Sequence, residues 1–268
     1  MRRKNGFSKP LGCHQILSWV VVFSMVNVFY ILYIPAFNSS AISVITFLYS
    51  VALFLTLFWG FRATYADPLD QVVAEELRAK KWDLPFDAKK YNQICTVCNT
   101  HVTFESKHCG NCDKCIDGFD HHCNWLNNCV GKKNYAFFAY LIASLEALTG
   151  IQGSVGIYIV QNIISNNDVK NTLEDRLGID SGGMRVFYVC IVLFFTFISV
   201  LIFILNGNLI GFHIWLKKKG MSTYDFILQR RGKEKFKSKR VVPQIQKDDI
   251  EEGNRTADVS AVFKKESK

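Results

Sequence analysis

The sequence predicts an α-helical polytopic membrane protein with four transmembrane helices and a cytosolic, cysteine-rich two-zinc domain between helices 2 and 3. Three observations support this fold class. The apolar residues lie in four long blocks, the basic residues gather in particular segments outside those blocks, and seven of the nine cysteines fall between Cys95 and Cys129. A single soluble core in a chain of 268 residues does not need four apolar blocks of this length.

The first two blocks run from Ile16 to Ile34 and from Ala41 to Phe61, and only the segment PAFNSS separates them. A helix needs about 20 apolar residues to cross a hydrocarbon layer about 30 Å thick, so each block is long enough. The first block lacks a small-residue cleavage site and is followed at once by another block. We therefore interpret it as a retained helix and not as a removable signal peptide.

The third block runs from about Ala136 to Ile164, and the fourth, from Val186 to Leu205, contains no charged residue. Buried helices of a soluble protein are the alternative, and four such blocks in one small chain disfavour it. Glu146 lies inside the third block, where an ionised acid is unfavourable and usually faces a partner or a cavity. The sequence leaves open whether Glu146 is a protonated packing residue or a functional one.

The distribution of basic residues predicts the orientation. Four precede the first block, none lies in the short loop after it, ten lie between Arg62 and Lys133, three between Ser165 and Arg185, and fifteen from Lys217 onward. Cytoplasmic flanks of transmembrane helices carry the basic excess, so both termini and the long central loop are expected in the cytosol. The net charge of +9 then describes a membrane-facing surface. No nucleic-acid motif accompanies it, so nucleic acid is not an expected partner.

The expected organisation follows from these blocks and charges. It comprises a cytosolic N-terminus (1–15), helices 1 and 2 (16–61), a cytosolic linker (62–94), a cysteine-rich zinc domain (95–135), helices 3 and 4 (136–216) with a lumenal loop (165–185), and a basic cytosolic tail (217–268). Besides the bilayer itself, anionic lipids are candidate partners of the tail, because clustered Lys and Arg beside a membrane attract them.

The cysteine pattern predicts zinc. Disulfides are rare in the reducing cytosol, and repeated two-residue gaps between cysteines, with histidines interleaved, favour tetrahedral zinc sites. Seven cysteines together with His101, His108, His121 and His122 give eleven candidate ligands, of which two closed sites use eight. His101 has no nearby partner on a tight turn and is most simply a surface residue. Spacing alone does not decide between His121 and His122.

The order of these residues resembles the cysteine-rich domain of the DHHC protein S-acyltransferases (palmitoyltransferases). The matching run is Cys95-x2-Cys98-x9-His108-Cys109-x2-Cys112-x2-Cys115-x4-Asp120-His121-His122-Cys123-x5-Cys129. The resemblance continues through CVGKKNYAFF and includes the four-span layout. It implies one zinc on Cys95, Cys98, His108 and Cys115, and a second on Cys109, Cys112, His122 and Cys129. It also implies that Cys123 accepts the acyl group, with His121 and Asp120 beside it.

Two segments depart from the family pattern. Members commonly have Asp-Pro-Gly after the second span, where this chain has Asp67-Pro68-Leu69, and Thr-Thr-x-Glu after the fourth, where it has Ser222-Thr223-Tyr224-Asp225. Ser222 and Asp225 keep a hydroxyl and a carboxylate. We therefore expect function to be weakened by these departures and not lost.

The residues also support this chemistry directly. A free cysteine is only a few per cent thiolate at neutral pH and needs a neighbouring base or cation. His121 lies two positions before Cys123, and Asp120 could orient its imidazole, as in other acyl-transfer sites. Zinc ions with four protein ligands have no open position, so both are expected to be structural.

The predicted function is S-palmitoylation. Eleven residues separate Cys123 from Tyr135, so the thiol should lie near the membrane, where an acyl chain could rest among the helices. Cys123 would take the acyl group from acyl-CoA (palmitoyl-CoA) as a thioester and pass it to cytosolic cysteines of membrane-associated proteins. The expected location is an endomembrane (Golgi or endoplasmic reticulum) or the plasma membrane. A zinc-bearing membrane scaffold or a RING-type ubiquitin ligase is the alternative, but neither needs a spare cysteine beside a spare histidine.

Overall fold

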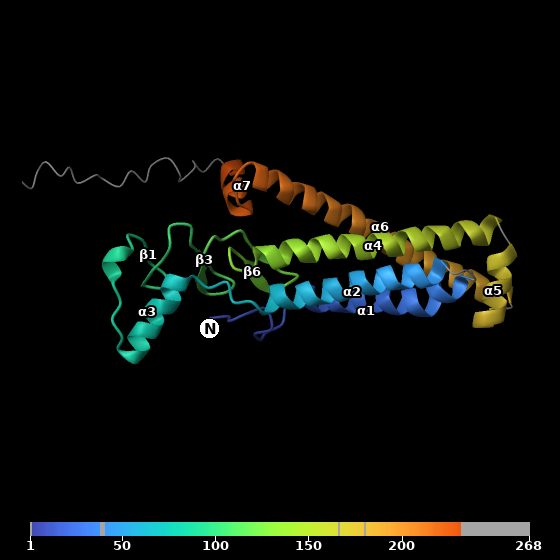
Figure 1. Ribbon diagram of the computed structural model, residues 1–268, viewed down its shortest axis with the longest axis horizontal. Coiled ribbons are helices and arrows are strands. Elements are labelled where there is room, and N and C mark those ends of the chain that lie inside the picture. Colours follow the sequence, from blue (N-terminus) through green and yellow to red (C-terminus); the bar gives the residue numbers. More distant parts are fainter. Residues whose placement is uncertain (1, 38–40, 166, 180, 232–268) are drawn as a thin grey trace, which may run out of the picture. The chain divides into compact units, whose positions relative to one another are not determined.

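The computed structural model describes residues 2–37, 41–165, 167–179 and 181–231 (Figure 1). The chain divides into two units, Met1–Phe226 and Ile227–Lys268. Of the second unit the structure describes only 227–231, where the last helix, α7 (Thr223–Arg230), ends. The basic tail that the sequence suggests as a lipid contact therefore lies mostly outside the described residues.

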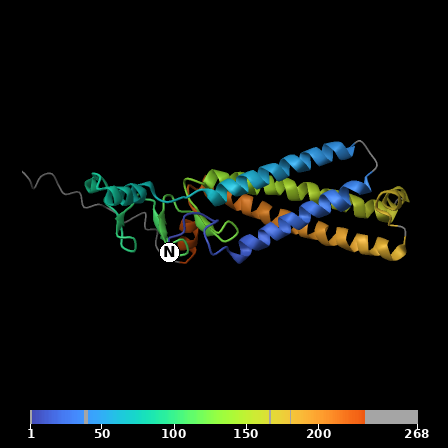
Figure 2. The same cartoon turned by 90° about the horizontal axis from the view of Figure 1, so that it is seen from below.

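The described residues contain four helices that are long and apolar enough to cross a membrane, as predicted. The first, α1 (Cys13–Val28), continues through a π-helical turn (Phe29–Tyr33) and a 3₁₀ turn (Ile34–Ala36). The others are α2 (Ala41–Tyr65), α4 (Tyr135–Ser165) and α6 (Gly182–Lys218). The four helices run in a common direction in both views, and α6 crosses α4 obliquely in Figure 1 (Figures 1 and 2).

Small residues on α4 allow α6 to approach closely. A Cβ atom at Gly156 would lie 2.0 Å from Thr196 Oγ1, so no larger residue fits there without a shift. The buried Tyr33 hydroxyl lies 2.9 Å from the same oxygen. Membrane helices lack a hydrophobic driving force between them and depend on such close packing and on hydrogen bonds.

Polar side chains of α4 pair with neighbouring helices. Gln152 is fully buried, accepts a hydrogen bond from Tyr49 of α2 at 2.9 Å and donates one to the Met25 carbonyl of α1 at 3.1 Å. The Glu146 carboxyl accepts a hydrogen bond of 2.7 Å from the Asn206 amide of α6. This contact favours the packing interpretation of Glu146.

The region between α2 and α4 consists of one helix and three short antiparallel hairpins. Helix α3 (Gln71–Trp82) and a 3₁₀ turn (Ala88–Lys90) come first. The hairpins are β1–β2 (Ile94–Cys95, Thr100–His101), β3–β4 (Lys107–Cys109, Lys114–Ile116) and β5–β6 (His121–Cys123, Asn128–Val130). A cysteine-rich region between the second and third long helices was predicted, and the structure confirms it. A further helix, α5 (Asn167–Leu177), lies in the loop between α4 and α6 and was not predicted.

Candidate functional site

The three hairpins repeat one pattern. Cys95, Cys109 and Cys123 recur every 14 residues, and each ends the first strand of its hairpin. The turns contain Asn99, Asp113 and Asn127, all with positive φ values of 50° or 51°. Asn and Asp are the non-glycine residues that best tolerate this left-handed conformation. The sequence analysis missed this repeat, although it is visible in the sequence.

The end of β1, the turn that follows it and the strands of the second hairpin form one cluster. Ligand atoms of Cys95, Cys98, His108 and Cys115 all lie within 4.8 Å of one another. The Cys98 sulfur is 3.2 Å from His108 Nδ1 and 3.5 Å from the Cys115 sulfur. His108 and Cys115 face each other across the β3–β4 ladder, so the register of that hairpin presents both side chains to the preceding turn.

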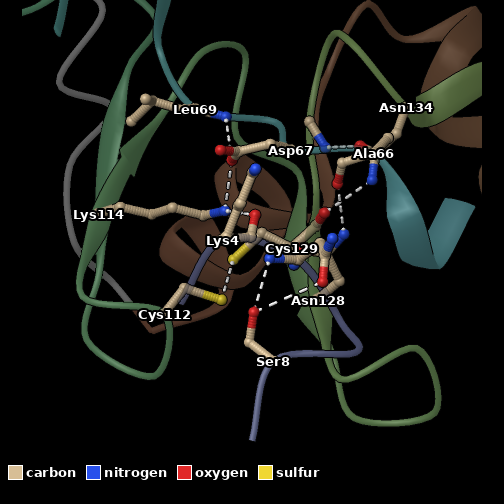
Figure 3. Close-up of polar contacts among 12 residues, drawn as sticks. Lys4, Ser8, Ala66, Asp67, Leu69, Cys112, Lys114, Asn128, Cys129 and Asn134 are labelled. Carbon is tan, nitrogen blue, oxygen red and sulfur yellow. Dashed lines mark hydrogen bonds and ion pairs between the residues drawn. The ribbon is translucent and has the colours of Figure 1, made fainter. Parts of the chain in front are cut away.

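The second cluster repeats this arrangement one hairpin later. It contains Cys109 at the end of β3 and Cys112 in the turn that follows, with His122 and Cys129 paired across β5–β6. The sulfurs of Cys112 and Cys129 lie 3.4 Å apart (Figure 3), and both side chains are fully buried. Each cluster therefore joins two successive hairpins.

Both clusters have the donor set of a structural zinc site. Three thiolates and one imidazole form a common tetrahedral zinc set, with Zn–S bonds of about 2.3 Å. Two sulfurs on such an ion lie about 3.8 Å apart, close to the observed 3.4 Å and 3.5 Å. The two Cys3His clusters thus indicate two zinc sites. Each cluster contains the four residues that the family resemblance implies for it. His101 lies outside both clusters and contacts Glu76 at 3.0 Å.

Cys123 belongs to neither cluster. In the third hairpin Leu126 occupies the position that Cys98 and Cys112 hold in the other two. Within the described part of the chain no further hairpin follows β6, because α4 begins at Tyr135. The Cys123 thiol therefore has neither a second cysteine in its turn nor a following pair of strands. It is 8 % exposed and packs among apolar residues, including Ala63 of α2 and Phe138 of α4.

Asp120 and His121 form a hydrogen-bonded pair next to Cys123, with Asp120 Oδ2 2.7 Å from His121 Nδ1. Burial raises the cost of charging Asp120, but hydrogen bonds from His121 and Thr223 outweigh it and lower the pKa of this carboxyl. Burial also opposes a charged His121, yet its contacts with Asp120 and Cys123 raise the pKa of His121 to about 9. The pair is therefore a carboxylate beside an imidazolium, next to the Cys123 thiol.

Thr223 anchors Asp120 from the segment that follows α6. Its backbone N–H donates to Asp120 Oδ1 at 2.9 Å and its hydroxyl to Oδ2 at 2.8 Å. The flanking residues fix Thr223 through a reciprocal capping box. The Asp225 N–H donates to the Ser222 hydroxyl at 3.1 Å, and the Ser222 N–H donates to the Asp225 carboxylate at 3.3 Å. Ser and Asp thus form this capping box in place of the commoner Thr and Glu.

The other departing segment holds the hairpins against the end of α2. Asp67 accepts hydrogen bonds from the Leu69 N–H at 3.1 Å and from the Lys114 ammonium at 2.6 Å. Lys114 is fully buried and also donates to the Lys4 carbonyl at 2.9 Å (Figure 3). The Asn128 amide donates to the Ala66 carbonyl at 2.8 Å. The N-terminal segment, the end of α2 and the second and third hairpins are therefore bonded to one another.

The sequence analysis did not single out two residues near the Asp120–His121 pair, His213 and Tyr135. His213 of α6 has a ligand atom within 4.8 Å of atoms of Asp120 and His121, and its Nδ1 lies 3.0 Å from the Tyr135 hydroxyl. His213 is 90 positions from Cys123 in the sequence, so no local spacing marks it.

Residues 88–230 match the model of the DHHC palmitoyltransferase family. Among curated proteins the chain is similar to the human palmitoyltransferase ZDHHC11, with 31 % identity over 92 % of this chain and 65 % of that protein. The probable human palmitoyltransferase ZDHHC11B is 31 % identical over 92 % of this chain and 72 % of its own length. Probable protein S-acyltransferase 20 of Arabidopsis thaliana is 39 % identical over 52 % of this chain, which spans only 20 % of that relative.

Proposed function

The chain belongs to the DHHC palmitoyltransferase family, and from this premise we propose that it transfers a long-chain fatty acyl group to cysteines of membrane-associated proteins. One observation carries the proposal. Of the seven cysteines between Cys95 and Cys129, six form the two metal-type clusters, and Cys123 stands outside both beside the Asp120–His121 pair. A spare thiol with an adjacent imidazole is what nucleophilic acyl transfer needs and what a purely structural zinc domain does not.

In the proposed first step His121 holds the proton of the Cys123 thiol, and the thiolate attacks the carbonyl carbon of acyl-CoA. The new carbon–sulfur bond replaces the bond to coenzyme A, whose thiolate leaves and takes up the proton that His121 held, so that His121 is neutral again before the second step. In the second step the thiol of a protein substrate loses its proton to His121 and attacks the acyl-Cys123 thioester. The Cys123 thiolate then leaves. Each step exchanges one thioester for another, so the residues mainly lower a barrier.

Asp120 would orient and charge-stabilise His121, as the carboxylate does in other acyl-transfer triads. Its buried position and its two hydrogen bonds from Thr223 support this role. Zinc would be held by Cys95, Cys98, His108 and Cys115, and by Cys109, Cys112, His122 and Cys129. With four protein ligands each, the ions would fold the hairpins and leave the chemistry to Cys123.

The surroundings of Cys123 support an acyl donor that approaches from the membrane. The thiol packs against α2 and α4, both of which are apolar enough to cross a bilayer. We propose that the acyl chain lies among the helices while coenzyme A stays in the cytosol, and that both termini and the hairpins are cytosolic. The proposed location is an endomembrane, either Golgi or endoplasmic reticulum, or the plasma membrane.

Incubation of the purified protein with alkyne-tagged palmitoyl-CoA tests the proposal. The natural chain should acquire a label that neutral hydroxylamine removes, because a thioester is sensitive to it. Cys123→Ser should remain unlabelled, while the matched control Cys13→Ser, which changes an exposed cysteine outside both clusters, should label normally. Equal labelling of natural chain and Cys123→Ser would reject Cys123 as the acceptor. An unlabelled natural chain would favour a scaffold or ubiquitin-ligase function.

A further inference from the structure

A second polar pair lies beside Asp120 and His121. Tyr135, the first residue of α4, and His213, in the last two turns of α6, are joined by a contact of 3.0 Å between the hydroxyl and Nδ1. His213 is only 7 % exposed. A buried imidazole must find partners for its two ring nitrogens or lose hydrogen-bond energy.

The surroundings of His213 are otherwise aromatic. Its ring centroid lies 5.1 Å from that of Phe138 and 6.0 Å from that of His121, so His213 and His121 contact the same phenyl ring. One polar atom each from Asp120, His121 and His213 lies within 4.8 Å of the other two. The two polar pairs are therefore immediate neighbours in a largely buried site.

The Tyr135 contact constrains the imidazole chemically. When the hydroxyl donates to Nδ1, a neutral imidazole carries its hydrogen on Nε2 and offers one donor. The Asp120 carboxylate is the nearby anion, and among the described residues its Oδ1 accepts a hydrogen bond only from the Thr223 N–H. A donor close to a buried carboxylate helps to hold it in place.

We propose that His213 is a positioning residue for acyl transfer, oriented by Tyr135 and acting through the Asp120–His121 pair. This inference rests on the proposed function. Helix α6 carries His213 and leads on to Thr223. The same part of the chain therefore contacts the pair twice, because Thr223 bonds to Asp120 and His213 lies beside both Asp120 and His121. His213 does not act on the acyl donor directly, so its loss should slow the chemical step and leave donor binding unchanged.

A packing role makes the opposite prediction, and two substitutions separate the roles. His213→Phe keeps an aromatic ring against Phe138 but removes both nitrogens. His213→Gln loses the ring but keeps an acceptor and a donor. If His213 only fills space, the phenylalanine variant should be the more active. If His213 positions the Asp120–His121 pair, His213→Gln should be the more active of the two variants.

We expect His213→Phe to lower kcat for acyl loading about 10- to 100-fold, the usual range for residues that orient a reacting group, with KM for palmitoyl-CoA unchanged. His213→Gln should recover part of this loss. Tyr135→Phe removes only one oxygen and should lower kcat by a smaller factor. The double variant with phenylalanine at both positions should be no slower than His213→Phe alone, because the two residues act as one unit.

The measurement is single-turnover loading with palmitoyl-CoA, accompanied by zinc content and thermal unfolding for each variant. Ile214→Ala, at a 52 % exposed neighbour on α6, is the control and should load like the natural chain. Loading by His213→Phe at or above the rate of His213→Gln would overturn the inference. If His213→Phe loses zinc or unfolds, Tyr135→Phe decides, and its full activity would also overturn the inference. Absence of loading in the natural chain would instead reject the proposed function.

Discussion

Removal of one cysteine should have opposite consequences at Cys129 and at Cys123. Cys129 joins the third hairpin to the second through the cluster with Cys109, Cys112 and His122. The third hairpin also contains His121 and Cys123, and Asp120 directly precedes its first strand. The cluster therefore supports all three residues of the proposed catalytic group. Cys123 supports no cluster, and its replacement by serine changes one buried atom.

The expected magnitudes follow from these positions. Structural zinc contributes about 10–16 kcal/mol in zinc-finger peptides. A whole domain is stable by only about 5–15 kcal/mol. Cys129→Ser should therefore lose one of two zinc ions per chain and unfold the third hairpin. Cys123→Ser should retain both ions and unfold at nearly the temperature of the natural chain.

The assay is zinc content by inductively coupled plasma mass spectrometry on detergent-purified protein, with thermal unfolding alongside. Cys98→Ser is the matched variant for the other cluster and should also lose one ion. If Cys123→Ser released a zinc ion, Cys123 would be a ligand, and the division of the seven cysteines into six ligands and one nucleophile would be wrong.

Four further predictions concern the Asp120–His121 pair, the Asp67–Lys114 ion pair and the topology. His121→Ala should slow loading about 10²–10⁴-fold near neutral pH and recover as the pH rises, because Cys123 then ionises unaided; a flat pH profile with undiminished loading would exclude His121 as the base. Since folding raises the pKa of His121 to about 9, its charged interaction with Asp120 should stabilise the fold fully below about pH 6.5 and be lost as the pH rises through 9. The stability difference between the natural chain and Asp120→Asn should shrink over that interval, and an unchanged difference in denaturant melts would count against the charged pair. Asp67→Asn should cost about 3–5 kcal/mol of unfolding free energy, because it removes the carboxylate that neutralises the buried Lys114 ammonium. Lys114→Met should cost less, since Asp67 is 26 % exposed and can be hydrated. Equal losses of unfolding free energy for the two variants would contradict this asymmetry. Tags at both termini should be digested by protease outside sealed microsomes, and a protected C-terminal tag would contradict the proposed topology.

Local sequence predicted the parts of the fold that local chemistry determines. Long apolar blocks form membrane-length helices wherever they occur, and the cysteine spacing within each tight turn brings ligands together irrespective of distant contacts. The sequence also indicates that Cys123 is not a metal ligand, because Leu126 stands where the other two units of the 14-residue repeat have a cysteine. The family resemblance, and not the repeat, led to Cys123.

The remaining features depend on tertiary contacts. His213 reaches Asp120 and His121 only because α6 packs on α4, and no local pattern distinguishes it from another histidine at a helix end. The Lys114–Asp67 pair likewise joins segments 47 residues apart. The amphipathic helix α5 contains many polar residues, so the search for apolar blocks passed over it.

The most direct test of the central claim is intact-protein mass spectrometry after one turnover, followed by a chase. With palmitoyl-CoA alone, the natural chain should gain one acyl group, and peptide mapping should place it on Cys123. Addition of a cysteine-containing membrane-anchored peptide should then remove the acyl group from Cys123 and transfer it to the peptide at the same rate. An acyl group on another cysteine, or one that stays on Cys123 while the peptide becomes acylated, would contradict a thioester intermediate at Cys123.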